Sequence, residues 1–117
     1  MQKTHQHPTD SAIAKDFHEV VNMTPATLKK WLETDDSRRV GQKKDGSDES
    51  VGHHSGARIL EILAKPQKEL EEDDYAHMHK VVGYVRRHAA QGPTVNDVAT
   101  SDWRFSLMNW GHDPLKK

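Results

Sequence analysis

The sequence predicts an all-α protein, a compact bundle of four to five helices with a long Gly-rich loop between helices two and three. Three observations support this fold class. Apolar residues recur every three or four positions in several segments, which is the spacing of one face of an α-helix. Helix start and stop signals flank these segments. The alternation typical of β-strands is missing, apart from an Asp45-Gly46 turn signal that would suit a tiny hairpin.

Length and composition suit one modest domain. The chain has 117 residues, of which 33% are apolar and 30% charged, so its core must be built from few apolar residues. We interpret residues 1–9 as a flexible polar tail and residues 10–117 as a single all-α domain.

The first two helices are predicted on either side of a short connection. The first is SAIAKDFHEVV, with Asp10 or Ser11 as its cap and Phe17 on its apolar face. The second has Thr24 as N-cap and Pro25 at its first position, followed by ATLKKWLET. It should bury Leu28, Trp31 and Leu32.

Three further helices are predicted after the loop. Ser55 is interpreted as the cap of GARILEILAK, a segment that is apolar almost all round and is therefore expected to be the central helix. The next runs from about Asp73 to Gln91 and ends at Gly92-Pro93. Its core arc comprises Tyr75, Met78, Val81, Val82, Val85 and Ala89, and a separate basic arc comprises His77, Lys80, Tyr84, Arg87 and His88. A short last helix is expected to begin near Ser101.

The loop at 40–56, VGQKKDGSDESVGHHSG, is the strongest candidate site. Connections longer than about 12–15 residues without their own structure tend to be functional or disordered. Backbone N–H groups at a helix start favour an anion, and lysine or arginine adds charge-assisted bonds to phosphate. The candidate residues are Lys43, Lys44, Gly52, Ser55, Gly56 and Arg58. In the alternative interpretation the glycines only permit turns and Ser55 only caps the helix. The segment lacks the GxxxxGK[ST] pattern of a mononucleotide site.

Charge is segregated along the chain although the formal net charge is only -1. A first basic segment holds Lys29, Lys30, Arg38, Arg39, Lys43 and Lys44, and a second holds Lys80, Arg86 and Arg87. Residues 68–74 are strongly acidic. If the basic segments meet in space, they form a face that can release counterions from a phosphate backbone. If they pair instead with residues 69–74, a solvated surface is the better interpretation.

Several function classes have no support in the sequence. The absence of cysteine rules out disulfides, thiolate catalysis and cysteine-ligated zinc. The histidines show no HExxH spacing. Ser106, His112 and Asp113 are the residue types of a catalytic triad, but any chain this polar contains such a combination. We therefore expect no enzyme, no metal site and no cofactor. No membrane-spanning or secretory stretch is apparent, so a cytoplasmic protein is expected, nucleoid-associated if it binds DNA.

Three segments carry a resemblance to a known family. They are VNMTPATLKKWLETDDSRRVGQKKDGSDESVGHHSG, DDYAHMHKVVGYVRRHAAQ and SLMNWGHDPLKK. Together they resemble an uncharacterised family of small proteins, domain of unknown function 3140, over roughly residues 17–117. Some members carry a DNA-binding label, so the resemblance implies a lead towards DNA. It supplies no catalytic residues.

Two functional hypotheses follow. In the first, the protein is a small DNA-binding accessory protein that contacts backbone phosphates with weak sequence preference. Its predicted contacts are the two basic segments together with Gly52, Ser55, Gly56 and Arg58. In the second, it is a protein-interaction module whose acidic 69–74 edge and basic face dock a partner or another copy. The sequence leaves the oligomeric state and the partner open.

Overall fold

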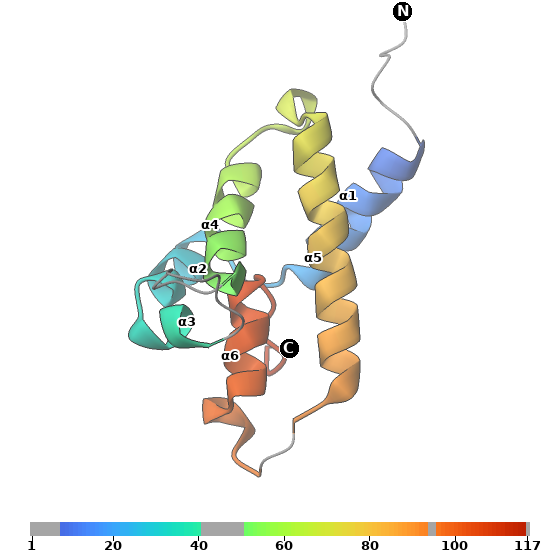
Figure 1. The fold of residues 1–117 in the computed structure, drawn as a ribbon. Coiled ribbons are helices and arrows are strands. Elements are labelled where there is room, and N and C mark those ends of the chain that lie inside the picture. The colour runs from blue at the N-terminus through green and yellow to red at the C-terminus, as the bar shows by residue number, and fades with distance from the viewer. Residues whose placement is uncertain (1–7, 41–50, 94–95, 117) are drawn as a thin grey trace, which may run out of the picture.

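The computed structural model describes residues 8–40, 51–93 and 96–116 (Figure 1). Within these ranges the chain forms α-helices and two short 3-10 turns and contains no β-strand, which confirms the all-α class. The helices are α1 (Pro8–Val20), α2 (Pro25–Leu32), α3 (Asp35–Arg39), α4 (Val51–Leu63), α5 (Glu72–Gln91) and α6 (Asp102–Asn109). The 3-10 turns are η1 (Gln67–Glu69) and η2 (Val98–Thr100).

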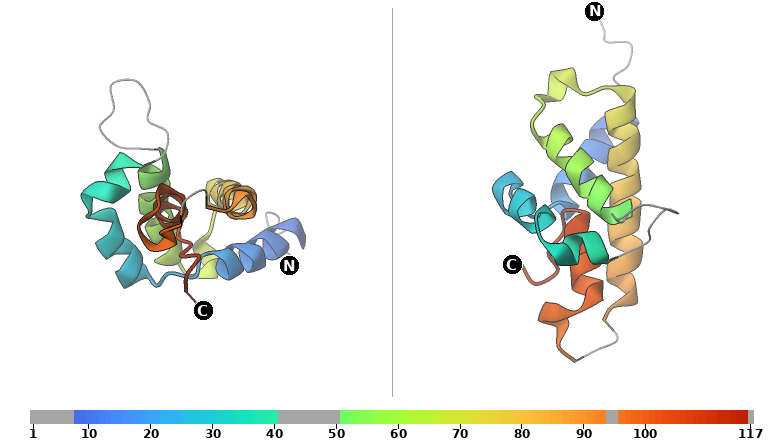
Figure 2. Two further views of the ribbon diagram at one scale, coloured as in Figure 1. Left: turned by 90° about the horizontal axis from the view of Figure 1, so that it is seen from below. Right: turned by 60° about the vertical axis from the view of Figure 1, so that its left-hand side comes forward.

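The helices are arranged with α4 and α6 in the middle of the bundle (Figures 1 and 2). Helices α2 and α3 cover one side of this pair, and α5 lies on the other side with α1 packed against it. Helix α6 contacts α2, α3, α4 and α5. Helices α2 and α5 do not contact each other.

The core draws one fully buried side chain from each of five helices. Phe17 of α1, Leu28 of α2, Ile59 of α4, Met78 of α5 and Leu107 of α6 all lie in one apolar cluster. Burying such side chains contributes roughly 1.5–3 kcal/mol each relative to leaving them in water. Apolar residues at helical spacing therefore determine which face of each helix turns inward.

The start of α2 confirms the predicted cap. The Thr24 hydroxyl accepts a hydrogen bond from the Thr27 amide at 3.2 Å, and Pro25 opens the helix. Leu28, Trp31 and Leu32 are buried as expected.

Helix α5 also follows the prediction closely. It begins at Glu72, one residue before the expected Asp73, and the Asp74 carboxylate accepts a hydrogen bond from the Glu71 amide at 2.9 Å. It ends at Gln91, where Gly92 takes a φ of 72° that other residues rarely adopt. The predicted core arc is buried or half-buried throughout.

The short helix α3 was not predicted. The Thr34 hydroxyl caps it by accepting a hydrogen bond from the Ser37 amide at 3.1 Å. The helix buries only Ser37, so it has no apolar periodicity from which a helix could be inferred. The described residues thus contain six α-helices instead of four to five.

The predicted start of the third helix was wrong. Helix α4 already includes Val51, so Ser55 lies inside it and is no N-cap. Gly52 and Gly56, interpreted as turn residues, are buried helical positions. A Cβ atom on Gly56 would lie 2.6 Å from Leu32 Cδ2. The glycine is therefore needed for close packing between α4 and α2, and the remainder of the predicted loop, residues 41–50, lies outside the described ranges.

The end of the chain folds back onto the α1–α2 connection. Helix α6 begins beside Ser101, as expected, and the Ser101 hydroxyl caps it by accepting a hydrogen bond from the Arg104 amide. Gly111 ends the last turn with a φ of 81°. Asn22 and Asp113 then exchange two hydrogen bonds of 2.8 and 3.0 Å. Arg104 donates hydrogen bonds from Nε and Nη2 to the two carboxylate oxygens of Asp113, at 3.0 and 2.9 Å.

Candidate functional site

The residues predicted to contact phosphate fall on different parts of the bundle. Lys29 and Lys30 are exposed on α2, which lies on the opposite side of α4 and α6 from α5 (Figure 2). Lys80, Arg86 and Arg87 are exposed on α5. Arg38 and Arg39 belong to α3, and Gly52, Ser55, Gly56 and Arg58 belong to α4. Lys43 and Lys44 lie outside the described ranges. The described parts of the two basic segments therefore do not come together through α2 and α5.

Some of these cations are already paired with carboxylates. Arg39 contacts Asp36 and Asp102, each at 3.0 Å, and the hydrogen bond with Asp102 is the main reason why its pKa is raised. Arg86 lies 3.5 Å from Asp16 of α1. Exposed pairs of this kind contribute little stability, and they reduce the charge that is available to a phosphate.

Arg58 is engaged more strongly, at the buried Asp74 carboxylate. Only 1% of the Asp74 side chain is exposed, and Arg58 and Lys65 each approach it to 2.8 Å. Burial raises the pKa of Asp74, but the hydrogen bonds from Lys65, the Glu71 amide and Arg58 outweigh it and lower the pKa to about 2. One predicted phosphate ligand thus pairs with the acidic segment, which is the arrangement expected of a structural ion pair.

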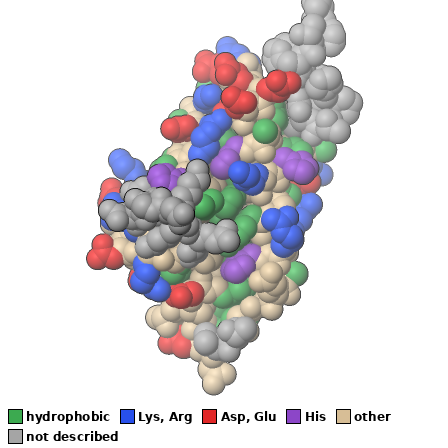
Figure 3. All heavy atoms as spheres, in the orientation of Figure 1, with side chains coloured by type: hydrophobic (Ala, Val, Ile, Leu, Met, Phe, Trp, Pro, Cys, Tyr) green, Lys and Arg blue, Asp and Glu red, His purple; other side chains and the backbone are tan. Residues whose placement is uncertain are grey.

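The cations without such a partner lie on α2 and α5. Lys29, Lys30, Lys80 and Arg87 form no ion pair with another residue of the part of the chain that the structure describes. Lys80 and Arg87 lie on α5, the helix that also carries the rings of His77, Tyr84 and His88. Figure 3 shows Lys and Arg side chains spread over the middle of α5, with acidic side chains gathered where that helix begins.

The aromatic row joins α5 to the end of α6. Tyr84 stacks on Trp110 with ring centroids 4.3 Å apart, and on His88 at 5.2 Å. His77 stacks on Trp110 at 6.3 Å. Tyr84, which the sequence placed on the basic arc of this helix, is packed on Trp110. The predicted basic arc of α5 is therefore partly an internal contact surface.

Polar contacts fix these rings. The Ser55 hydroxyl lies 2.9 Å from His77 Nε2, so this serine joins α4 to α5 instead of capping a helix. The Trp103 indole donates to the His88 carbonyl at 2.9 Å. Burial lowers the pKa of His77 and of His88, and nearby Arg58 and Lys80 lower that of His77 further. Burial raises the pKa of Tyr84.

A cavity of about 380 Å³ lies beside this row. It is lined by Val51 and Gly52 of α4, Tyr84 and His88 of α5, and Ser106, Asn109 and Trp110 at the end of α6. The sequence did not predict it. The four-residue spacing of Gly52 and Gly56 was a signal that could have indicated it, because residues four apart lie on one helix face and small residues there allow a second helix to approach.

A buried polar junction behind the cavity was also missed. Asn109, which is fully buried, accepts hydrogen bonds from Trp31 Nε1 at 2.8 Å and from the Ser37 hydroxyl at 2.5 Å. Its amide donates to the Ser37 carbonyl at 2.9 Å, and His53 Nδ1 lies 2.9 Å from the Ser37 hydroxyl. This junction ties α2, α3, α4 and α6 together and explains why α3 forms where it does.

The described residues contain no group of three or more histidine or acidic side chains that could hold a metal ion. Among the helices in these same ranges, none has the length and apolar character needed to cross a membrane.

Comparison with known proteins identifies a family for the chain but no characterised relative. No curated protein and no solved structure is significantly similar to it. A family model described as "Protein of unknown function (DUF3140)" matches residues 16–108, which is most of the chain. The chain therefore belongs to the DUF3140 family of proteins of unknown function.

Proposed function

We propose that this protein binds DNA through backbone phosphates and that the exposed side of α5 is its main contact surface. The observation that carries this proposal is the charge of that helix: from Ala76 to Gln91 it contains no carboxylate. Lys80 and Arg87 are exposed there and free of ion pairs with other described residues. Cations in this state are able to replace the counterions of a phosphate backbone.

The remaining predicted contacts have different roles in this proposal. Arg86 can turn from its weak pair with Asp16 to a phosphate, because the Arg86 side chain is largely exposed and the two charges are 3.5 Å apart. Lys29 and Lys30 form a second basic patch on α2, a helix that does not contact α5. In this proposal the duplex bound at α5 does not contact them. Lys43 and Lys44 stay in the proposal on the basis of sequence alone. Arg58 is the weakest candidate, since leaving Asp74 would expose a buried carboxylate without its partner.

Contacts to phosphate fix position without reading sequence, so the proposed binding has weak sequence preference. The formal net charge of -1 makes weak affinity the expectation as well. In this proposal the protein acts by binding and not as an enzyme. DNA binding would place it in the cytoplasm, at the nucleoid.

The test is fluorescence anisotropy of a labelled duplex of about 20 bp over a salt series from about 50 to 200 mM. The variant Lys80→Glu/Arg87→Glu should flatten the slope of log affinity against log salt by about 2, one for each lost phosphate contact. The control is Lys15→Glu/Lys68→Glu, which changes the net charge equally at exposed positions of α1 and η1 instead of α5. An equal effect of both variants, or no binding by the wild type at about 50 mM salt, would contradict the proposal.

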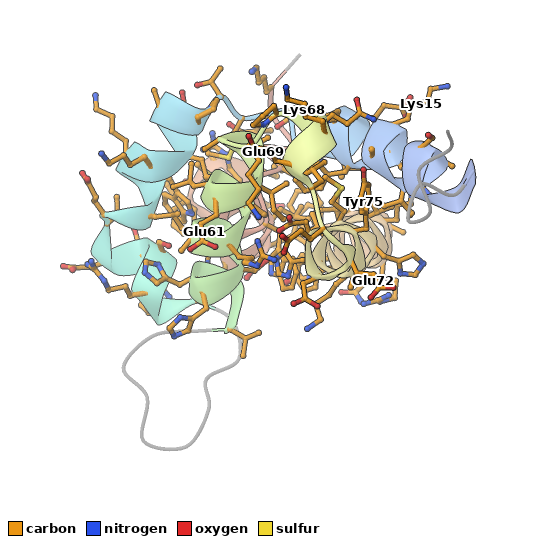
Figure 4. The ribbon with its side chains drawn as sticks, turned by 90° about the horizontal axis from the view of Figure 1, so that it is seen from above. Lys15, Glu61, Lys68, Glu69, Glu72 and Tyr75 are labelled. Carbon is orange, nitrogen blue, oxygen red and sulfur yellow. The ribbon has the colours of Figure 1, made fainter. Side chains whose placement is uncertain are left out.

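The second candidate function, protein docking, rests on the acidic end of the molecule. Glu69, Glu71, Glu72 and Asp73 are all exposed there. Figure 4 looks onto this end and shows Glu69 in η1 beside Lys68, and Glu72 at the start of α5. Such an end can dock on the basic side of α5 of a second copy through complementary charge.

Sedimentation velocity at low and high salt separates the two functions. Docking of two copies predicts a concentration-dependent dimer that dissociates as salt rises and is lost in Glu71→Lys/Glu72→Lys. If the protein is monomeric at all concentrations and salts, self-docking is excluded while DNA binding stays open to its own test.

A further inference from the structure

The cavity beside the aromatic row has the dimensions of a small-molecule site. Its volume of about 380 Å³ falls within the range of roughly 300–1,000 Å³ that is typical of ligand pockets. It lies where the first turn of α4, the second half of α5 and the end of α6 converge. Pockets between the helices of a bundle are common ligand sites.

The walls of the cavity favour a flat aromatic molecule. Tyr84, His88 and Trp110 contribute rings to the lining, and Tyr84 stacks between the other two within 5.2 Å on each side. Because each ring is held by a neighbour, its orientation is preset before any ligand arrives. Aromatic rings prefer offset-stacked or edge-to-face contacts, which a planar ligand can make and a globular aliphatic one cannot.

Polar groups in the lining can orient such a ligand. Ser106 brings a hydroxyl that interacts with Tyr84. His88 Nε2 is buried, and within the described ranges it has no hydrogen-bond partner. Gln91 lies near enough to influence the His88 ring, yet no hydrogen bond of normal geometry reaches Nε2. A buried polar atom without a partner carries a free-energy penalty that a ligand group can relieve.

The electrostatic surroundings favour a negative charge on the ligand. Among the described residues that line the cavity, none is an aspartate or a glutamate. Arg87 acts electrostatically on Tyr84, and its guanidinium lies against Gly83, where a Cβ atom would be 3.1 Å from a guanidinium nitrogen. Arg87 does not line the cavity, but an anion bound beside Tyr84 would lie close to this exposed cation, which has no ion-pair partner among the described residues.

From the volume, the aromatic walls and the adjacent Arg87, we infer that this cavity binds a small planar aromatic anion, such as an aromatic carboxylate. The aromatic part makes edge-to-face contacts with Tyr84 and Trp110, because the facing sides of these two rings already stack on each other, and the anionic group points towards Arg87. This inference does not rest on DNA binding, since it concerns a separate cavity and a ligand of low molecular weight.

The experiment uses the full chain without DNA and follows the side-chain indole N–H signals of its three tryptophans by nitrogen-15 NMR. The probe is 1-naphthoate, with neutral 1-naphthamide and non-planar cyclohexanecarboxylate as comparison compounds. We expect 1-naphthoate to shift the Trp110 signal most and to bind at least about tenfold more tightly than either comparison compound. A largest shift at Trp31, or equal affinities for all three compounds, would overturn the inference.

Two variants locate the ligand. Arg87→Glu should weaken binding at least about fivefold, while Arg86→Glu, which makes the same charge change on the next residue, should leave it unchanged. Val51→Phe should abolish binding by filling the cavity from its rim. If Val51→Phe does not fold, the comparison of Arg86→Glu with Arg87→Glu still decides. Equal weakening by both arginine variants would show only general charge attraction and would refute the assigned site.

Discussion

The rings of Tyr84 and Trp110 stack with centroids 4.3 Å apart and planes inclined by 15°. This contact joins the long helix α5 to the end of α6, and it turns the predicted basic face of α5 into a surface that is partly packed. The same two rings line the cavity at this junction. The stability of the bundle and the shape of its candidate site therefore depend on one pair of side chains.

Tyr84→Ala is expected to reduce the free energy of unfolding by about 2–3 kcal/mol, because it removes the stacked ring as well as its buried area. Tyr84→Phe keeps the ring and loses only the interaction with Ser106, so its effect should stay within about 1 kcal/mol. Urea denaturation measures both values. The exposed His79→Ala on the same helix serves as the control and should change stability by less than about 0.5 kcal/mol. Equal losses for Tyr84→Ala and Tyr84→Phe would show that the ring contact contributes nothing.

Two glycines within helices should respond in opposite directions to alanine. A Cβ atom on Gly56 would lie 2.7 Å from the Asn109 carbonyl oxygen and 2.6 Å from Leu32, so Gly56→Ala should destabilise by about 2 kcal/mol. At Gly83 the added atom would meet only the mobile end of Arg87, so Gly83→Ala should stabilise by about 0.5–1 kcal/mol through helix propensity. Thermal unfolding of the two variants gives both signs. A stabilising Gly56→Ala would contradict the packing of α4 on α2 and α6.

Asp74 should govern stability in acid. Its pKa falls from 3.8 to about 2 on folding, so its contribution is present above pH 3.8 and is lost as the pH falls from there through about 2. The shift corresponds to about 2 kcal/mol at neutral pH. Asp74→Asn should therefore be less stable than the wild type at pH 7, and the difference should shrink towards pH 2. Denaturation midpoints over this range measure it, and a constant difference at all pH values would rule out the assigned ionisation.

Asn109 should be one of the least replaceable polar residues. Asn109→Ala removes the acceptor of the Trp31 indole and of the Ser37 hydroxyl and also leaves a cavity, so we expect a loss of about 3 kcal/mol. Asn109→Asp keeps the shape but places a carboxylate oxygen against the Ser37 carbonyl, and it should be similarly harmful. Chemical denaturation provides the values, with the exposed Asn96→Ala as a control. A loss of less than about 1 kcal/mol for both variants would mean that the junction is not buried in solution.

The sequence was informative wherever a signal is local. The cap at Thr24, the stop at Gly92 and the core arc of α5 depend on residues a few positions apart, and all three were predicted correctly. Helix α3 escaped because a single capping hydroxyl at Thr34, without apolar periodicity, does not distinguish a helix from a turn.

The candidate site was only partly predictable for the same reason. The basic character of α5 is a property of one segment and could be seen directly, whereas the pairing of Arg58 with Asp74 depends on how α4 packs beside α5. Gly56 was interpreted as a turn residue because glycine is common in turns and loops. Only the nearness of Leu32 shows that a glycine is needed there to let α4 pack closely on α2.

The amino-acid sequence by itself thus determined the all-α class, most helix boundaries and the faces that turn inward, because helical periodicity and capping act over a few residues. Only the tertiary structure decided which described cations pair with described carboxylates, that Tyr84 packs on Trp110, and that a cavity forms where α4, α5 and α6 meet. These features join residues that are distant along the chain, and their proximity arises from the packing of whole helices, which no local pattern records.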